Sequence, residues 1–427
     1  MKETLQEKLA RRKYKIPNKF VYFVLNKGIV KPFLAPKFHP TYHIIDNIND
    51  YKGPCFLIYN HQSRMDYIYI TQATYPRPLN FVVGYNEFFR SHLQFIFKLI
   101  HNIPKKNFNS DVASIRAMNQ IIKQNGVVCI APEGMSSITG HNQPIALGTG
   151  KLLKHYHIPV YMVKLKGAFL SNTKVCLDER YGKVDVTLQR LFDEEQLRNL
   201  SVEDIENKIN EELWQDDYEW NKKERIRFDM KGNGCSHLHD LCYHCFRCNK
   251  DFTMFGEKDK IVCKECGNGA TLNEYYDLIP FDDTCVIPES ISKWVDEERR
   301  LVYHEIQDEN FEFKEEVKIG KIPEDHYLKN QATSEICGEG ILTINHEGFF
   351  YKGTKDNQEF EFKIDYNHLP TLGMPIDVTF FSIYHDGKYY DIFPKNAVVG
   401  KILLIVEEMH RLHINAWKNF PWADTYK

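Results

Sequence analysis

Residues 55–66 read Cys-Phe-Leu-Ile-Tyr-Asn-His-Gln-Ser-Arg-Met-Asp, an apolar run followed directly by polar side chains. The five residues of the run predict a short buried strand. A second stretch repeats the arrangement, because the apolar run 127–130 is followed directly by Ala-Pro-Glu-Gly-Met-Ser-Ser at 131–137. Further apolar runs at 81–83 and 160–163, with helical spacing between them, predict strands that alternate with helices. The alternation predicts an α/β domain with a mostly parallel sheet flanked by helices.

Both polar motifs are expected at the carboxyl ends of strands, where open α/β sheets bind their ligands. His61 is a candidate general base, because a neutral imidazole can remove a proton from a substrate hydroxyl. Asp66, five residues later, can fix the imidazole tautomer and stabilise its protonated form. A single His-x4-Asp pattern is common by chance, and a single Pro-Glu-Gly is an ordinary turn. The two together, each after a buried strand and about seventy residues apart, are a more specific signal.

Other residues around these motifs are candidates for substrate binding. Backbone N–H groups near Gly134, or at a helix start, could stabilise an oxyanion. Lys105 and Lys106 follow Asn102-Ile103-Pro104 and could bind a phosphate.

Cysteines define a second module. Cys245 and Cys248 form one Cys-x2-Cys pair, and Cys263 and Cys266 form another after fourteen intervening residues. This spacing is typical of a zinc ribbon, and four thiolates leave no open coordination position, so we expect a structural zinc ion. The nearby residues Cys235, His237, His239, Cys242 and His244 could supply a second site, although ordinary residues beside the ribbon are the simpler interpretation.

Composition limits the remaining options. The 427 residues carry a net charge of −3, and neither a secretory signal nor a run of 18 apolar residues is present, so we expect a cytoplasmic protein without a transmembrane helix. The stretch 277–325 holds fifteen acidic and six basic residues, which argues against nucleic-acid binding by the ribbon.

The two ends of the chain differ in character. Residues 1–45 are expected to form basic amphipathic helices, because residues 1–37 hold ten Lys or Arg and two acids among apolar clusters. Such a segment either binds an anionic membrane surface or packs on the catalytic domain. The region 290–427 is rich in predicted strands, with Asp386-Gly387 as a hairpin turn and a final helix from 398 to 413. With the catalytic domain at 46–230 and the ribbon at 235–285, four regions are expected.

Residues 50–170 resemble the lysophosphatidic-acid/glycerol-phosphate acyltransferase family. Asn60, His61 and Asp66 match its first motif, Asn-His-x4-Asp, and Pro132-Glu133-Gly134 matches the third, Phe-Pro-Glu-Gly-Thr-Arg-Ser. The resemblance implies His61 as general base, an acyl-CoA or acyl-carrier-protein donor, and a lysophospholipid-like acceptor in a membrane. It further implies substrate-binding roles for the residues at or beside its motifs: Asn60, Arg64, Lys105, Lys106, Glu133, Gly134, Ser136 and Pro159. Pro159 lies in the stretch that resembles the fourth motif, which helps shape the acyl site.

The sequence departs from the family pattern in two places. Ser136 replaces the arginine of the third motif, and Lys105 or Lys106 replaces that of the second. Lysine does not reproduce the bidentate fork of arginine, so the identity of the acceptor is open. Arg64, inside the first motif, could compensate.

The order of modules resembles an architecture of bacterial acyltransferases, whose β-rich tail is similar to a pleckstrin-homology barrel with a final helix. We therefore expect an enzyme bound peripherally to the inner face of the cell membrane. Two other interpretations remain: a catalytically inactive lipid-binding or scaffolding protein that retains the fold, and a zinc-ribbon interaction module.

Overall fold

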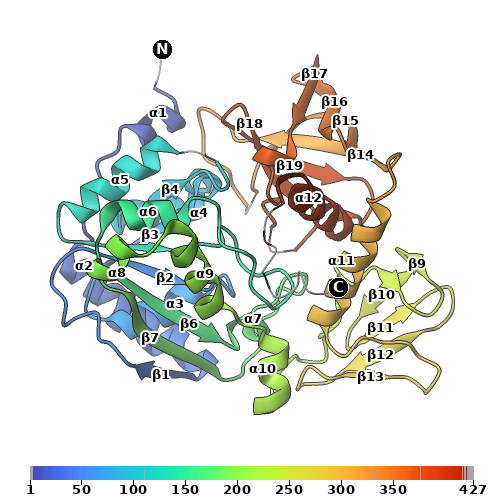
Figure 1. The fold of residues 1–427 in the computed structure, drawn as a ribbon, viewed down its shortest axis with the longest axis horizontal. Coiled ribbons are helices and arrows are strands. Elements are labelled where there is room, and N and C mark those ends of the chain that lie inside the picture. The colour runs from blue at the N-terminus through green and yellow to red at the C-terminus, as the bar shows by residue number, and fades with distance from the viewer. Residues whose placement is uncertain are drawn as a thin grey trace.

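The structure is a computed structural model, and it describes residues 3–109, 111–330, 332–375, 377–415, 417 and 420. Three parts lie around a single long helix (Figure 1). An α/β part contains the first half of the chain, a small β-rich part contains the cysteine pairs, and a larger antiparallel sheet with a terminal helix completes the molecule.

The α/β part is built on a seven-stranded sheet in the order β1-β7-β6-β2-β5-β3-β4. The pair β6·β7 is antiparallel, and the other neighbours in this sheet pair in parallel. This confirms the mostly parallel sheet, and the four apolar runs of the sequence lie in β2, β3, β5 and β6. The strands are β1 (Pro40–Ile44), β2 (Cys55–Tyr59), β3 (Leu79–Gly84), β4 (Ile103–Lys105), β5 (Val127–Ile130), β6 (Val160–Lys166) and β7 (Val184–Phe192).

Helices cover both faces of this sheet, which explains why β2 is buried along its whole length. Cys55, Leu57 and Tyr59 pack into one core with α3 and η1, whereas Phe56 and Ile58 pack into a second core with α5, α6 and α9. The alternation is the period-2 pattern of a strand. The helices are α1 (Leu5–Ala10), α2 (Lys19–Phe23), η1 (Val24–Leu34), η2 (Ala35–Phe38), α3 (Asp66–Thr74), η3 (Tyr85–Phe89), α4 (Ser91–Leu99), α5 (Val112–Ile122), α6 (Thr149–Tyr156), α7 (Ala168–Ser171), α8 (Glu194–Asn199), α9 (Val202–Leu213) and α10 (Asp217–Glu224).

The N-terminal segment is helical at 5–10 and 19–38 and not helical at 11–18, and it also supplies a strand. β1 lies within the stretch 1–45 that was expected to be helical, and it pairs in parallel with β7 at the edge of the sheet. Among the described residues, no helix is long and apolar enough to cross a membrane.

The cysteine region consists of short antiparallel strands. β8 pairs with β9, and β10 to β13 form a four-stranded sheet in sequence order. The elements are η4 (Leu238–Asp240), β8 (His244–Cys245), β9 (Lys250–Asp251), β10 (Met254–Glu257), β11 (Lys260–Cys263), β12 (Gly269–Leu272) and β13 (Leu278–Pro280).

The C-terminal part is a six-stranded antiparallel sheet in the order β17-β16-β15-β14-β19-β18. Phe362 of β17 stacks on His385 of β18 at 4.9 Å between ring centroids, so the sheet curls until its edge strands meet through side chains. No strand pairing joins these two edges in the described residues, so the expected closed barrel is not confirmed. The elements are β14 (Glu312–Lys321), β15 (Glu335–Asn345), β16 (Gly348–Lys355), β17 (Gln358–Ile364), η5 (Tyr366–His368), β18 (Phe381–His385), β19 (Lys388–Pro394) and α12 (Val399–Ile414).

The hairpin turn and the final helix of this part agree with the predictions from the sequence. Asp386 and Gly387 both have positive φ, +48° and +70°, and form the turn between β18 and β19 as expected. The final helix α12 agrees with the predicted range within a residue at each end.

The long helix α11 (Ile291–Glu305) was not predicted. This stretch was expected to belong to the β-rich region 290–427, but Ser290 caps a helix and Ile291, Trp294 and Val302 are buried at helical spacing. One continuous apolar core joins α11 to the α/β part, the cysteine region and α12. Figure 1 shows α11 running between the cysteine region and α12.

Candidate active site

His61 and Asp66 meet as the sequence analysis expected. His61 follows the carboxyl end of β2, and its Nδ1 lies 2.8 Å from Oδ2 of Asp66, the first residue of α3. The Asp66 side chain is 3% exposed and that of His61 is 27% exposed. Within the described chain, Nε2 of His61 has no hydrogen-bond partner. One ring nitrogen is therefore held by a buried carboxylate while the other remains available to a substrate.

Ser63 supports the carboxylate and was missed by the sequence analysis. Its backbone N–H and its hydroxyl donate to Oδ1 of Asp66 at 2.9 Å and 3.0 Å. Burial raises the pKa of Asp66 above its ordinary value, although the bonds from His61 and Ser63 act in the opposite direction. The spacing Ser63-x-x-Asp66 is that of a helix capping pair, a signal that could have identified this residue.

The loop that follows β5 holds the backbone of His61 on both sides. The N–H of His61 donates to Oε1 of Glu133 at 2.8 Å, and its carbonyl accepts from the N–H of Ser137 at 2.6 Å. The two motifs are thus joined through the peptide groups of the candidate base itself, which fixes where the imidazole can point.

Glu133 has further partners on the same loop. Its carboxylate accepts from Nδ2 of Asn142 at 2.8 Å and from the N–H of Gln143 at 2.9 Å, and the residue is 2% exposed. Burial raises the pKa of Glu133 to about 7, against the effect of these donors. These hydrogen bonds hold the Glu133 carboxylate against the backbone of His61.

The other motif residues lie in different settings. Asn60 is fully buried, and its amide bonds both the N–H and the carbonyl of Leu165 on β6. Gly134 has a φ of +81°, and its N–H is already bonded to Ala131. Ser136 is half-buried and directly precedes Ser137, whose N–H bonds the carbonyl of His61. Pro159 precedes β6 and accepts from the N–H of Phe56, so the structure places it at the opposite end of the sheet from His61.

The basic side chains that were candidates for phosphate binding lie, like His61, at or beyond the carboxyl ends of strands in the α/β sheet. Lys105 ends β4, and its ammonium donates to the carbonyls of Lys106 and Asn109 at 2.7 Å and 2.6 Å. Lys106 donates to the carbonyl of Gly387, in the β18–β19 turn, at 2.6 Å. Arg64 donates to the carbonyl of Leu177 at 2.7 Å. The C-terminal sheet thus reaches the edge of the α/β sheet where the candidate site lies.

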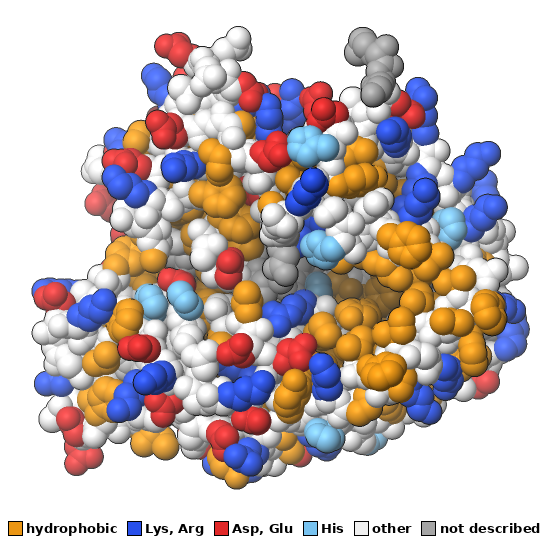
Figure 2. Space-filling view, turned by 180° about the vertical axis from the view of Figure 1, so that it is seen from behind, with side chains coloured by type: hydrophobic (Ala, Val, Ile, Leu, Met, Phe, Trp, Pro, Cys, Tyr) orange, Lys and Arg blue, Asp and Glu red, His pale blue; other side chains and the backbone are white. Residues whose placement is uncertain are grey.

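A hollow opens on the face shown in Figure 2, with hydrophobic side chains over the α/β part and Lys, Arg and His side chains around it. Glu133 lines a small cavity of about 20 Å³ together with Phe108, Gln143, Thr371 and Glu407, among others. His61 does not line this cavity, and its side chain is 27% exposed.

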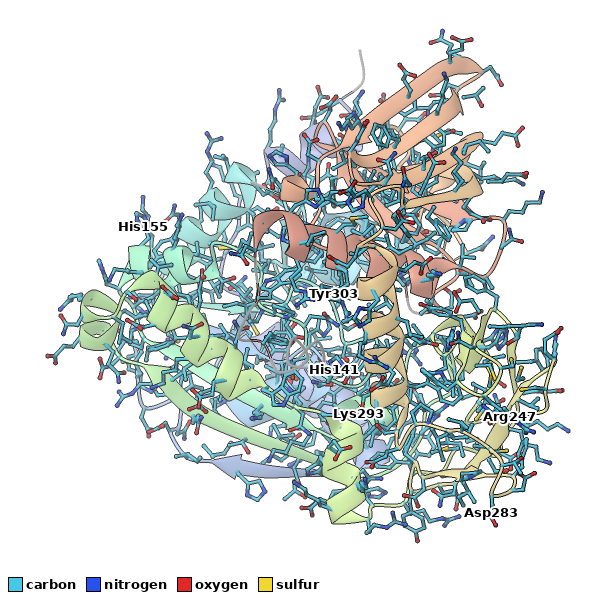
Figure 3. All side chains as sticks on the ribbon, turned by 45° about the vertical axis from the view of Figure 1, so that its right-hand side comes forward. His141, His155, Arg247, Asp283, Lys293 and Tyr303 are labelled. Atoms are coloured by element: carbon cyan, nitrogen blue, oxygen red, sulfur yellow. The ribbon has the colours of Figure 1, made fainter. Side chains whose placement is uncertain are left out.

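Helix α11 anchors the loop that holds His61. Nε2 of His141, on this loop, lies 2.9 Å from Oδ1 of Asp296 on α11, and both side chains are nearly buried. Figure 3 shows His141 beside α11, close to Lys293. Although burial works to lower the pKa of His141, the Asp296 carboxylate raises it above its ordinary value. The pKa of Asp296 is correspondingly lowered, against the effect of its burial.

The same helix also binds the cysteine region and α12. Nε1 of Trp294 donates to the carbonyl of His244 at 3.2 Å, and Glu298 accepts from the N–H of His244 at 2.8 Å. Arg299 pairs with Glu407 and Glu408 of α12 at 2.5 Å and 3.1 Å, with all three side chains at most 2% exposed.

The four expected cysteines converge. The Sγ atoms of Cys245 and Cys266 are 3.6 Å apart, those of Cys248 and Cys263 are 3.7 Å apart, and all four lie within 4.8 Å of one another. A tetrahedral zinc site with bonds of ~2.3 Å has sulfur–sulfur edges of about 3.8 Å, so the geometry fits one. Disulfide sulfurs would be about 2.05 Å apart.

The neighbouring residues do not form an equivalent site. His237, His239 and Asp240 lie within 4.8 Å of one another, but Cys235 and Cys242 are buried outside this group. Nδ1 of His239 accepts from the N–H of Gly256 at 3.0 Å, which places the proton of a neutral ring on Nε2. A protonated nitrogen cannot bind a metal.

Comparison with known proteins gives one family match within the α/β part. The family model described as Acyltransferase matches residues 39–166. No curated protein matches the chain. Among solved structures, the 1-acyl-sn-glycerophosphate (LPA) acyltransferase PlsC from Thermotoga maritima is similar, with a TM-score of 0.38 and 20% sequence identity over 46% of this chain and 77% of that one.

Replacing Asp296 with Asn should lower the free energy of unfolding by about 3 kcal/mol, because it leaves His141 buried without its partner. Urea denaturation measures the change. Glu297→Gln on the same helix is the matched control, since Glu297 pairs with Arg300 at 39–40% exposure and such pairs contribute at most about 1 kcal/mol. Equal effects of the two substitutions would contradict the anchoring role.

The stabilisation by the His141–Asp296 pair should decrease as the pH rises. Because the pKa of His141 is raised in the folded protein, its contribution is present below about pH 6.5 and is lost as the pH rises through the folded pKa. The stability difference between wild type and Asp296→Asn should therefore shrink as the pH rises above neutral.

Metal analysis of the purified chain should find one zinc ion per molecule. Cys263→Ser should abolish it and lower the thermal midpoint, because binding of a structural zinc stabilises the fold that holds it. Cys285→Ser, outside the cluster, should change neither quantity. A chain without stoichiometric zinc, or with zinc retained in Cys263→Ser, would overturn the four-cysteine site.

Proposed function

We propose that the acyltransferase domain transfers an acyl group from a thioester, acyl-CoA or acyl carrier protein, to the hydroxyl of a lysophospholipid-like acceptor. The reaction would resemble that of a 1-acyl-sn-glycerol-3-phosphate acyltransferase. The observation that carries the proposal is the 2.8 Å contact between Nδ1 of His61 and buried Asp66, in a His61 side chain that remains 27% exposed. The family match over residues 39–166 supports it.

In this mechanism, Nε2 of His61 removes the proton of the acceptor hydroxyl while the oxygen attacks the thioester carbonyl carbon. The carbon–sulfur bond then breaks, and the proton passes from the imidazolium to the departing thiolate. The products are an ester and a free thiol. Asp66 keeps the proton of the neutral ring on Nδ1 and stabilises the charged ring that forms.

The rest of the motif residues would position the base. Glu133 and Ser137 hold the peptide groups of His61, and Asn60 ties the end of β2 to β6. Asn60 and Glu133 were expected at the acceptor site, and their buried hydrogen bonds favour this positioning role instead. The oxyanion donors stay unassigned, since the N–H of Gly134 is already bonded.

Membrane contact is proposed for the N-terminal helices. Phe20, Phe23, Val24, Ile29 and Phe33 are exposed, Phe20 by 72%. Asn26 of η1 accepts from Gln72 of α3, so this surface adjoins the helix that begins with Asp66. Apolar residues among basic ones suit an anionic bilayer surface, such as the inner face of a cell membrane.

Combining Phe20→Ser with Phe33→Ser should lower the fraction of protein that floats with anionic vesicles.

A zinc-stabilised ribbon and the C-terminal sheet would then serve as structural parts of the enzyme.

The rival interpretation is a catalytically inactive lipid-binding protein that retains the fold. It is favoured by Ser136 in place of the third-motif arginine. It is disfavoured by the intact contact of His61 with Asp66, which a scaffold does not require.

Replacing His61 with Ala should lower kcat for thioester-dependent acyl transfer by at least about 100-fold, the usual contribution of a general base. The assay follows thiol release with lysophospholipid acceptors. His92→Ala, at an exposed position on α4 of the same domain, should retain full activity. Activity within a few-fold of wild type in His61→Ala, or no transfer by the wild-type chain with any acceptor or donor of these classes, would reject the proposal.

A further inference from the structure

Four consecutive polar residues are buried shortly after β6. Ser171, Asn172, Thr173 and Lys174 are between 0% and 7% exposed. The hydroxyls of Ser171 and Thr173 donate to nearby carbonyls. Neither the nitrogen nor the oxygen of the Asn172 amide has a hydrogen-bond partner in the described chain. Since buried polar atoms are almost always paired, this amide is available to an ordered water molecule or to a ligand.

Lys174 is the most unusual member of this group. Its ammonium donates only to two carbonyls of the C-terminal part, Pro375 at 3.2 Å and Met374 at 3.5 Å. No carboxylate of the described residues lies within ion-pair distance of it. Burial lowers the pKa of Lys174 to about 8, so it remains largely charged at neutral pH although it is poorly solvated.

Arg64 adds a second positive charge. It lies between His61 and Asp66 in the sequence, and it is near enough to Lys174 that its charge also lowers the pKa of that lysine. Burial lowers the pKa of Arg64 as well. Its hydrogen bond goes to a backbone carbonyl, that of Leu177, rather than to an acid. The carbonyl that Arg64 bonds, that of Leu177, lies three residues after Lys174 in the chain, so the two partly desolvated like charges lie in the same region.

The acids near these cations are engaged elsewhere. Glu179, near Arg64, lies 3.7 Å from Lys37, and Glu87, near Lys174, pairs with Arg90 at 3.0 Å. Asp377, also near Lys174, accepts from the hydroxyl of Thr379 at 3.0 Å and keeps its charge. These acids offset part of the positive charge, but among the described residues none lies within ion-pair distance of Arg64 or Lys174. An anion bound there would relieve the remaining repulsion and desolvation.

We propose that Arg64 and Lys174, with the unpaired amide of Asn172, form a binding site for a phosphate monoester between the acyltransferase domain and the 374–375 loop. Lys174 and Asn172 lie beyond the residues that match the family model. The proposal rests on the proposed function in that the phosphate belongs to one of its substrates, either the acceptor headgroup or the 3′-phosphate of coenzyme A. It makes the C-terminal part a wall of the substrate site.

Calorimetry with the full-length chain tests the site. The probes are sn-glycerol 3-phosphate, for the acceptor headgroup, and coenzyme A, for the donor, with uncharged glycerol as the blank. Lys174→Met and Arg64→Gln remove one charge each and roughly keep the side-chain length. Lys183→Met is the matched control, because Lys183 already pairs with Asp185 at 2.9 Å and is partly exposed.

One probe should bind about tenfold or more weakly to both Lys174→Met and Arg64→Gln, as expected for a lost charge-assisted hydrogen bond. Lys183→Met should bind like wild type. Weakened binding of glycerol 3-phosphate assigns the site to the acceptor, and weakened binding of coenzyme A assigns it to the donor. The proposal is overturned if both variants bind both probes like wild type, or if wild type binds neither.

Two further measurements distinguish a phosphate site from a purely structural role of Lys174 and from a failure of catalysis. If Lys174 served only to hold the 374–375 loop, Lys174→Met would lower the thermal midpoint without changing probe binding, and this result would also reject the site. His61→Ala should bind both probes normally. The calorimetric test of the phosphate site is therefore independent of the activity assay. Calorimetry can reject the phosphate site even if acyl transfer requires His61. Conversely, the phosphate site can be supported even if the activity assay rejects acyl transfer.

Discussion

The pair of hydrogen bonds that holds the peptide groups of His61 is the constraint on which the candidate site depends. Glu133 accepts from its N–H and Ser137 donates to its carbonyl, so the imidazole can reach Asp66 only while the loop after β5 keeps its shape. That loop is anchored in turn by the buried His141–Asp296 pair on α11. The geometry of the candidate site, set by two local motifs, is thus held in place by Asp296 of α11, which lies 155 residues after His141 in the chain.

This dependence gives the distal parts of the chain a physical role. Helix α11 bonds the cysteine region through His244 and α12 through Arg299. Most of these groups are buried, and a buried polar group that loses its partner costs about 1–3 kcal/mol, more if it is charged. Loosening one module therefore weakens the others. The C-terminal part also reaches the strand ends directly, where Lys106 and Lys174 donate to its carbonyls. It belongs to the candidate site rather than being appended to it.

Sequence reasoning found what depends on local pattern. The apolar runs located β2, β3, β5 and β6, the motif spacing brought His61 to Asp66, and the Cys-x2-Cys pairs located the four thiols. It missed α11, whose helical spacing was obscured by its acidic composition, and it placed β1 in a helical segment. Asp296 and Lys174 could not be found, because their roles come from contacts between residues far apart in sequence. The substrate roles expected for Asn60 and Glu133 rested on the motifs alone, which do not show which atoms are already bonded.

The central claim is that His61 presents an unprotonated Nε2 because Asp66 retains the ring proton on Nδ1. Nitrogen-15 chemical shifts of histidine-labelled protein report this directly, with the His61 signals assigned by their loss in a His61→Gln sample. The account predicts the Nδ1–H tautomer when the ring is neutral, and a shift toward the Nε2–H form in Asp66→Asn. A neutral His61 that carries its proton on Nε2 in the wild-type chain would contradict it.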